Sequence, residues 1–256
     1  MYTNLRYDRI LWVGFLLVIG LLLYSAIGRK RNSFAEGVAV EVIPLKSGDK
    51  LISERDVRQA LLRSFGNTLE GTELANLEVE RMERVLEEDP FVLDAEAYID
   101  QHNVFHVKIQ QREPVLRVLD NNGGNYYLDK DGIKMPPSPN FAARVMVATG
   151  NVAPYMVDFK KHKKRSTLKD LFSLTETLMA DEFLAGFIQQ IHISNTGEFT
   201  LIPLIGDQKI ILGSTRKVDD KLRRLKIFYQ QGMPYTGWRS YETINLAFSG
   251  QVVCKR

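Results

Sequence analysis

The longest apolar segment lies close to the N-terminus. Ile10–Ile27 contains no charged side chain, and its only hydroxyl groups belong to Tyr24 and Ser25. A helix of this length would extend roughly 27 Å at a rise of about 1.5 Å per residue, enough to cross the hydrocarbon core of a bilayer. The pattern therefore predicts a single transmembrane helix over residues 10–28, after a short head at residues 1–9.

A cleaved secretory signal is the alternative for this segment, because Ala26–Gly28 fits a cleavage site. However, the apolar run is longer than the usual signal core of about 7–15 residues, and the basic Arg29–Arg31 follows at once. These two features favour an uncleaved anchor. Charge does not fix its orientation, since Arg6 and Arg9 precede the segment and Arg29–Arg31 follows it.

The next part of the chain predicts one compact αβ unit over residues 38–113. Ser53–Asp56 is a capping-box pattern that begins a helix, and Gly66 is a natural stop for it. Strict alternation of apolar and polar residues predicts the strands. The expected elements are a strand at Val38–Val42, helices at Ser53–Gly66 and Glu78–Glu88, and strands at Val92–Asp100 and Val104–Gln111.

Glu113-Pro114 separates this unit from a second one over residues 114–256, because proline cannot donate to a central sheet ladder. The second unit is predicted to be rich in strands, with two helices at Leu168–Ala180 and Arg216–Gln230. Its expected strands are Val115–Leu119, Tyr126–Leu128, Arg144–Thr149, Ile188–Ser194, Phe199–Ile205, Lys209–Leu212 and Thr243–Cys254. The predicted fold class is α+β.

Composition narrows the possible classes of protein. The 256 residues are 45% hydrophobic with a net charge of only +3, which excludes a wholly disordered chain and gives no sign of a dedicated nucleic-acid binder. Because Cys254 is the single cysteine, an intramolecular disulfide and a cysteine-cluster metal site are both excluded.

Two basic runs stand out within this balanced charge. Val157–Asp170 and Arg216–Lys226 each hold six cations and two acids, a net charge of +4. We interpret them first as solvated faces. Contact with anionic lipid headgroups or an acidic partner is the second interpretation, and nucleic-acid binding is the third, since stacking aromatic residues are scarce in both runs.

No residue pattern predicts catalysis, a cofactor site or a metal site. Phosphate-loop, zinc-protease and serine-hydrolase motifs do not occur. His102 and His106 fall in a strand-turn context and are expected to face solvent, and Asp129–Gly132 is expected to be a plain turn. The acids of Glu78–Asp89 are interpreted as a solvated helix face, so we expect no small-molecule substrate.

Several short motifs resemble those of the bacterial cell-division family FtsQ/DivIB when they are taken in order. Val107–Val115 resembles the family's junction between its two domains, and Tyr126–Gly132 resembles the hairpin after it. Ile211–Gly213, Lys221-Leu222 and Ile244–Leu246 resemble the end of its second domain. The resemblance implies that residues 38–113 form a POTRA-like β-α-α-β-β domain and that residues 114–256 form the β-rich domain of this family.

The resemblance also implies a function and a location. Members of the family are non-enzymatic scaffolds that link early and late division proteins and help to control septal peptidoglycan synthesis. It implies a single-pass protein of the cytoplasmic membrane, with residues 1–9 in the cytoplasm, residues 29–256 outside it, and enrichment at the division septum. The implied partners are the membrane, division proteins of the FtsB and FtsL type, and the septal peptidoglycan synthase complex, without nucleic acid.

Thr243–Cys254 is the expected partner-binding segment, because an unpaired strand edge can accept an extended peptide. Ile244, Leu246 and Phe248 alternate and are expected to face the core, which would make the strand part of the domain's own sheet as well. The complete predicted set is Trp238, Tyr241, Ile244, Asn245, Leu246, Ala247, Phe248, Ser249, Gln251, Val252, Val253 and Cys254.

Three other functions remain open at this point. The first is another membrane-tethered POTRA-type protein that assists envelope assembly or transport. The second is an envelope enzyme that uses carboxylates such as Asp129 and Asp131, and the third is a membrane-anchored nucleic-acid binder that uses Lys160–Arg165.

Overall fold

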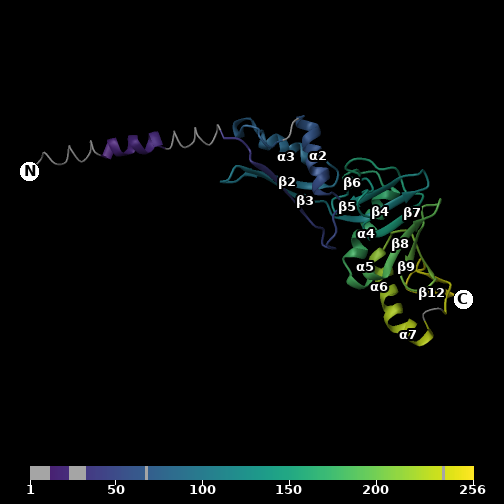
Figure 1. Ribbon diagram of the computed structural model, residues 1–256. Helices are drawn as coiled ribbons and strands as arrows, with labels where there is room; N and C mark the ends of the chain where they lie inside the picture. The colour runs from purple at the N-terminus through teal and green to yellow at the C-terminus, as the bar shows by residue number, and fades with distance from the viewer. Residues whose placement is uncertain (1–11, 23–32, 67–68, 238–239) are drawn as a thin grey trace, which may run out of the picture. The chain divides into compact units, whose positions relative to one another are not determined.

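The computed structural model describes residues 12–22, 33–66, 69–237 and 240–256. The chain divides into two compact units, Met1–Gln111 and Arg112–Arg256, and each is considered by itself (Figure 1). Both units combine helices with sheets, so the predicted α+β class is confirmed.

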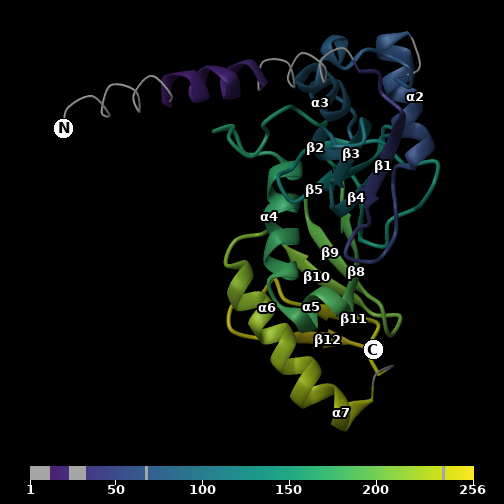
Figure 2. The same cartoon turned by 60° about the vertical axis from the view of Figure 1, so that its left-hand side comes forward.

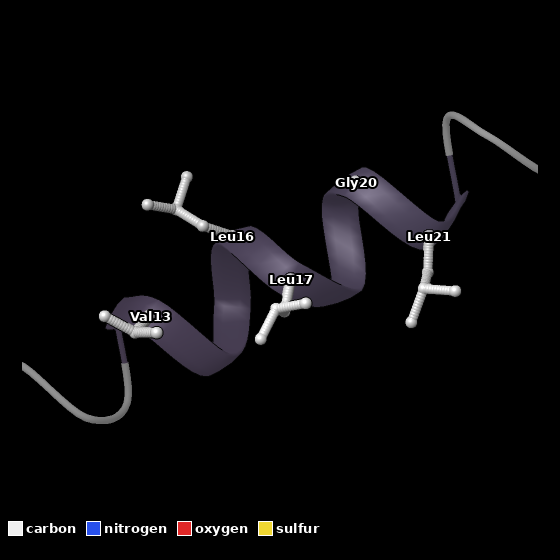
Figure 3. Close-up of a pocket in the computed structure, with 5 residues that line it drawn as sticks. All are labelled: Val13, Leu16, Leu17, Gly20 and Leu21. Carbon is white, nitrogen blue, oxygen red and sulfur yellow. The ribbon is translucent and has the colours of Figure 1, made fainter.

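Residues 12–22 form a helix with exposed apolar side chains. Figure 3 shows Val13, Leu16, Leu17 and Leu21, which line a shallow apolar hollow together with Gly20. No helix within the described residues is both long enough and apolar enough to span a bilayer. The ends of the segment predicted as a transmembrane helix, residues 10–28, and the whole head at residues 1–9 lie outside the described residues.

The first unit packs two helices against a three-stranded sheet. The strand order is β1-β3-β2, with β1 parallel and β2 antiparallel to the central β3. Phe105, Val107 and Ile109 of β3 are buried, as their alternation predicts. The elements are β1 (Gly37–Ile43), α2 (Glu54–Phe65), a 3-10 turn (Leu74–Asn76), α3 (Val79–Glu87), β2 (Val92–Ile99) and β3 (Val104–Gln111).

Local capping fixes the ends of α2. The Ser53 hydroxyl accepts a hydrogen bond from the Asp56 backbone N–H at 3.3 Å, and the Asp56 carboxylate accepts one from the Ser53 N–H at 2.9 Å. Two of the four unpaired N–H groups at the start of the helix are thereby satisfied. Gly66 ends the helix with a φ of 74°, a left-handed conformation that costs glycine little. The predicted helix boundaries are confirmed.

Gln111 joins the end of β3 to two other segments of the first unit. Its side-chain Oε1 accepts hydrogen bonds from the backbone N–H groups of Leu51 (2.6 Å) and Ile52 (3.2 Å). Its Nε2 donates to the carbonyl oxygen of Ile43 at 2.7 Å. Because Gln111 is only 2% exposed, these bonds are shielded from water and connect β1, β3 and the segment before α2.

The second unit is built on a nine-stranded mixed sheet with the order β12-β11-β10-β9-β8-β7-β4-β5-β6. One side of each central strand is buried in a single apolar cluster that also contains residues of α4 and α6. The strands are β4 (Pro114–Asp120), β5 (Asn125–Asp129), β6 (Lys134–Met135), β7 (Met146–Gly150), β8 (Ile188–Ile193), β9 (Phe199–Pro203), β10 (Lys209–Gly213), β11 (Thr243–Asn245) and β12 (Val253–Lys255).

The helices of this unit lie over that buried side of the sheet (Figure 2). They are α4 (Thr167–Met179), α5 (Glu182–Phe187), α6 (Val218–Ile227) and α7 (Met233–Thr236), with a π-helical turn at Phe228–Gly232 between the last two. The two predicted helices correspond to α4 and to α6 with the π-helical turn, whereas α5 and α7 were not predicted. Asp181 caps α5 by accepting from the Leu184 N–H, and such a short helix leaves too few residues for a periodic apolar pattern.

The C-terminal segment also differs from its prediction. Thr243–Cys254 is not one strand but contains β11, a connecting loop and most of β12, and the two strands pair antiparallel. The Asn245 side chain accepts a hydrogen bond from the Ala247 N–H at 2.9 Å, and this local turn ends β11. Because the chain turns there, Phe248 does not continue the alternation to the core and is 49% exposed, contrary to expectation.

Replacing Gln111 with alanine tests its role in the first unit. Gln111→Ala removes three buried hydrogen bonds, and we expect a loss of at least about 2 kcal/mol in the local free energy of opening. Hydrogen exchange of peptides from β1 and β3 measures this loss. The neighbouring Gln110 is exposed, so Gln110→Ala should change the same value by less than about 0.5 kcal/mol. Equal protection of both variants would contradict the assignment.

Candidate functional site

The candidate site is the β11–β12 end of the nine-stranded sheet. β12 is the terminal strand of that sheet and pairs with β11 alone among the described strands. Figure 2 shows β11 and β12 close to the C-terminus of the chain. An outer strand carries a row of backbone groups that a further strand can use, so this edge could accept an extended peptide.

The hydrogen-bond pattern of β11 shows which groups of β12 point outward. Glu242 O accepts from the Lys209 N–H, and the Leu246 N–H donates to Ile211 O, which places the even-numbered positions of β11 on the β10 side. Glu242, just before the strand, also donates its own N–H to Lys255 O of β12. Thr243 and Asn245 consequently bond toward β12. Their partners in register are Lys255 and Val253, which leaves the N–H and C=O of Cys254 on the outer side.

Arg224 of α6 holds the loop between β11 and β12. Its guanidinium donates to the carbonyl oxygens of Phe248 at 3.1 Å, Leu246 at 3.4 Å and Gln251. The side chain is only 13% exposed, and its Nε also donates to the Asp220 carboxylate at 3.0 Å. A planar fork of donors suits several carbonyl groups at once, and it fixes where β12 starts.

Asp220 lies between two guanidinium groups. Hydrogen bonds from Arg223 and from Arg224 lower the pKa of Asp220 below its ordinary value of 3.8. A carboxylate with a lowered pKa contributes stability above that ordinary value, and the contribution is lost as the pH falls through the lower folded-state value. At neutral pH the carboxylate is therefore ionised and orients Arg224 toward the loop.

Lys221 connects the same helix to the end of β10. Its Nζ donates to the carbonyl oxygens of Leu212 at 2.8 Å and Ser214 at 2.7 Å. The residue is 7% exposed, and its burial, followed by the nearby charge of Arg224, lowers its pKa. Lys221 and Arg224 together attach α6 to both neighbouring stretches of backbone.

The structure gathers most of the predicted site residues but gives them different exposures. Ile244 and Leu246 are fully buried, as expected from their alternation. Tyr241, Val252 and Cys254 are partly buried against the core. Trp238 lies outside the described residues. The remaining members lie at the surface, with Asn245 half-buried and Ala247, Phe248, Ser249, Gln251 and Val253 exposed.

One residue that belongs to this region was missed. Arg224 was counted only as one of six cations in a basic run, and no sequence signal connects it to a loop more than twenty residues away.

Two of the residues considered for chemistry, Asp129 and His106, make contacts within the fold. Asp129 is 1% exposed, binds Arg112 at 3.1 Å and accepts hydrogen bonds from the Asp131 and Ile133 N–H groups, so it builds a turn. His106 Nε2 lies 3.0 Å from Asp100. The described residues contain no group of three or more His, Cys, Asp or Glu that could hold a metal ion.

The chain is similar to known families over both of its units. Residues 113–255, more than half of the chain, match the family described as FtsQ/DivIB, C-terminal related. Residues 36–110 match the POTRA-like domain family. The chain is also similar to a protein named cell division protein FtsQ from Rhodothermus marinus, with 24% identity over 212 residues that cover 80% of this chain and 76% of that protein.

Replacing Arg224 tests whether it holds the loop. Arg224→Met keeps the apolar stem but removes the donors to the three carbonyl groups. We expect amide hydrogen exchange over residues 246–255 to accelerate by about tenfold or more, the equivalent of about 1.4 kcal/mol.

Arg223→Met is the matched control for this experiment. Arg223 also pairs with Asp220, but its side chain is 72% exposed and, within the described part of the chain, donates no hydrogen bond to the loop carbonyl groups. Its replacement should leave exchange over residues 246–255 unchanged. Equal acceleration in both variants would mean that the acidic partner, and not the carbonyl contacts, holds the loop.

Proposed function

Because the chain belongs to the FtsQ/DivIB, C-terminal related family, we propose that it is a non-enzymatic scaffold of the bacterial division machinery. It links early and late division proteins and helps to control septal peptidoglycan synthesis. The observation that carries this proposal is the outer edge of β12, fixed by Arg224 and bordered by exposed apolar side chains.

The proposed organisation follows the order of segments along the chain. Residues 1–9 are a cytoplasmic head, residues 10–28 are a membrane anchor, residues 38–113 are a POTRA-like domain and residues 114–256 are the β-rich domain. The bulk of the protein then lies outside the cytoplasmic membrane, at the division septum. The apolar composition of Ile10–Ile27 supports the anchor.

We propose that a division partner of the FtsB type, paired with FtsL, adds a strand to β12. The partner's backbone would bond to the outward N–H and C=O of Cys254 and to the positions two residues away. Each such bond contributes only about 0.5–1.5 kcal/mol net, and β12 has three residues, so apolar contacts must supply most of the affinity.

Two exposed side chains are suited to supply those contacts. Phe248 is 49% exposed in the loop that Arg224 holds, and Val253 is 41% exposed at the start of β12. Interface energy is usually concentrated in a few apolar or aromatic residues that a rigid frame presents. Phe248 would be the principal anchor, because its loop is tied to α6 before the partner arrives.

A second candidate function is an accessory role in envelope assembly or transport through the POTRA-like domain. β2 is an edge strand of eight residues in the first unit, and its Tyr98 is 53% exposed. An antiparallel edge of this length can also accept a client strand. This role would place the interaction in the first unit instead of at β12.

The location of the protein in dividing cells separates the two functions. A fluorescent protein fused to the N-terminus is expected to form a band at the division site before constriction is complete. Fluorescence imaging of native cells provides the measurement, and a variant without residues 10–28 is expected to lose the band. A uniform signal around the envelope would contradict the division role and favour the accessory role.

A proline at residue 254 tests strand addition directly. Cys254→Pro removes the outward N–H, while the bonds of Val253 and Lys255 to β11 remain available. We expect at least about a tenfold weaker affinity for the strand-forming partner, measured by titration of the purified chain with the soluble part of that partner.

Cys254→Val is the matched variant, because it keeps the N–H and a similar apolar volume. The Cys254 thiol has a pKa raised by burial, so no ionised sulfur is lost in either variant at neutral pH. Affinity close to that of the unmodified chain is expected for Cys254→Val. If Cys254→Pro binds equally well and retains the exchange protection of residues 243–255, strand addition at this edge is excluded.

A further inference from the structure

Two loops of the second unit form another surface, at the opposite end of the strand order from β12. The first loop is Lys130–Ile133 between β5 and β6, and the second is Met156–Lys164 before α4. We refer to them together as the basic–apolar surface. Lys160 Nζ lies 3.5 Å from the carbonyl oxygen of Lys130, which shows that the two loops are in contact.

A buried aromatic residue fixes the second loop in place. Phe159 is 3% exposed, and its ring packs edge-on against Phe172 of α4 with centroids 5.5 Å apart. Gly132 lies directly against Phe159, since a Cβ at that position would come within 3.1 Å of the ring. Lys160 is held by Glu176 at 2.9 Å and lies over the Phe172 ring.

This anchoring directs apolar side chains away from the core. Val157 is 73% exposed, Met156 is 53% exposed, and Ile133 of the neighbouring loop is 39% exposed. The exposed side chains come from both contacting loops, so they belong to one region of the unit. Transfer of these exposed apolar side chains from water into an apolar medium is favourable. An exposed apolar patch of this kind therefore marks an interaction site.

The cations beside these residues are not all used by the fold. Within the described residues, Lys161 pairs with Asp158 at 2.9 Å, Arg165 pairs with Asp170, and Lys169 donates to the carbonyl oxygen of His162. Lys163 and Lys164 are exposed, and neither makes a hydrogen bond or an ion pair with another described residue. These two lysines are therefore available to an external anion.

We propose that the basic–apolar surface binds an anionic lipid bilayer, with Met156 and Val157 at the headgroup boundary and Lys163 and Lys164 on lipid phosphates. Apolar side chains flanked by lysines are typical of interfacial membrane contacts. Nucleic acid fits less well, because the aromatic residue of this loop, Phe159, is buried and has no face left for a base.

The strength required of this contact is small if the chain is tethered as proposed above. A tether converts binding into an intramolecular event at high effective concentration. Each lysine close to an anionic bilayer contributes roughly fivefold to the binding constant, so the two lysines decide the occupancy of a tethered contact. The occupancy of the lipid contact depends on the membrane anchor of the proposed function, whereas its preference for anionic lipid depends on this surface alone.

The test uses the full chain in lipid nanodiscs and a single fluorescent label. Cys254→Val removes the only cysteine, and Val157→Cys introduces a site for an environment-sensitive dye. A nitroxide-bearing lipid should quench the dye in discs of equal parts phosphatidylcholine and phosphatidylglycerol, and much less in discs of phosphatidylcholine alone. A dye at Asp207→Cys, in the exposed turn between β9 and β10, should remain unquenched.

Charge reversal provides the matched variants. Lys163→Glu with Lys164→Glu is expected to shift the contact equilibrium by about tenfold or more and to abolish the quenching. Lys209→Glu with Arg223→Glu makes the same change in net charge at other exposed positions of the second unit and should preserve it. Absence of quenching, or equal quenching in neutral discs, would overturn the proposal and leave an acidic protein as the ligand of this surface.

Co-elution of the chain with the nanodiscs tests the membrane anchor independently of the quenching. If the chain does not co-elute with the discs, the membrane anchor of the proposed function is wrong. The same labelled chain is then added to vesicles of equal parts phosphatidylcholine and phosphatidylglycerol. Quenching that depends on Lys163 and Lys164 would still support the surface, and its absence would overturn it.

Discussion

The candidate partner-binding edge depends on the hydrogen bonds that Arg224 donates to the loop before β12. A strand of three residues with one neighbouring strand has little intrinsic stability. Arg224 binds three carbonyl groups of the loop from a helix that is itself packed in the core through Leu222 and Leu225. The edge is therefore presented in a fixed position although the strand itself is short.

Buried polar side chains serve the same purpose elsewhere in the protein. Gln111 joins three segments of the first unit, and Lys221 joins α6 to the end of β10. In each case a long side chain satisfies backbone groups that neither a helix nor a ladder pairs, and leaving such groups unpaired in the interior is costly. These contacts fix the ends of elements, which apolar packing alone positions less tightly because it is non-directional.

The sequence was sufficient wherever structure is local or strictly periodic. The capping box at Ser53, the stop at Gly66 and the buried face of β3 follow from neighbouring residues, and all were predicted. The break between β11 and β12 was not, because it depends on a turn at Asn245 and on contacts from the distant Arg224. Ile244 and Leu246 precede that break and were placed correctly, whereas Phe248 follows it and was not.

The two basic runs show why net charge alone does not identify a binding surface. Both carry +4, and in each run four of the six cations bond to other described residues. The cations without such a bond in the described part of the chain are Lys163 and Lys164 in one run and Arg216 and Lys217 in the other. Their neighbours differ, since Met156 and Val157 are exposed beside the first pair. An exposed cation in water gains little from an anion because both are well hydrated. Apolar side chains next to the lysines add the favourable free energy of leaving water, which only a bilayer or a folded partner can supply. The first run has such side chains, and this distinguishes it from the second.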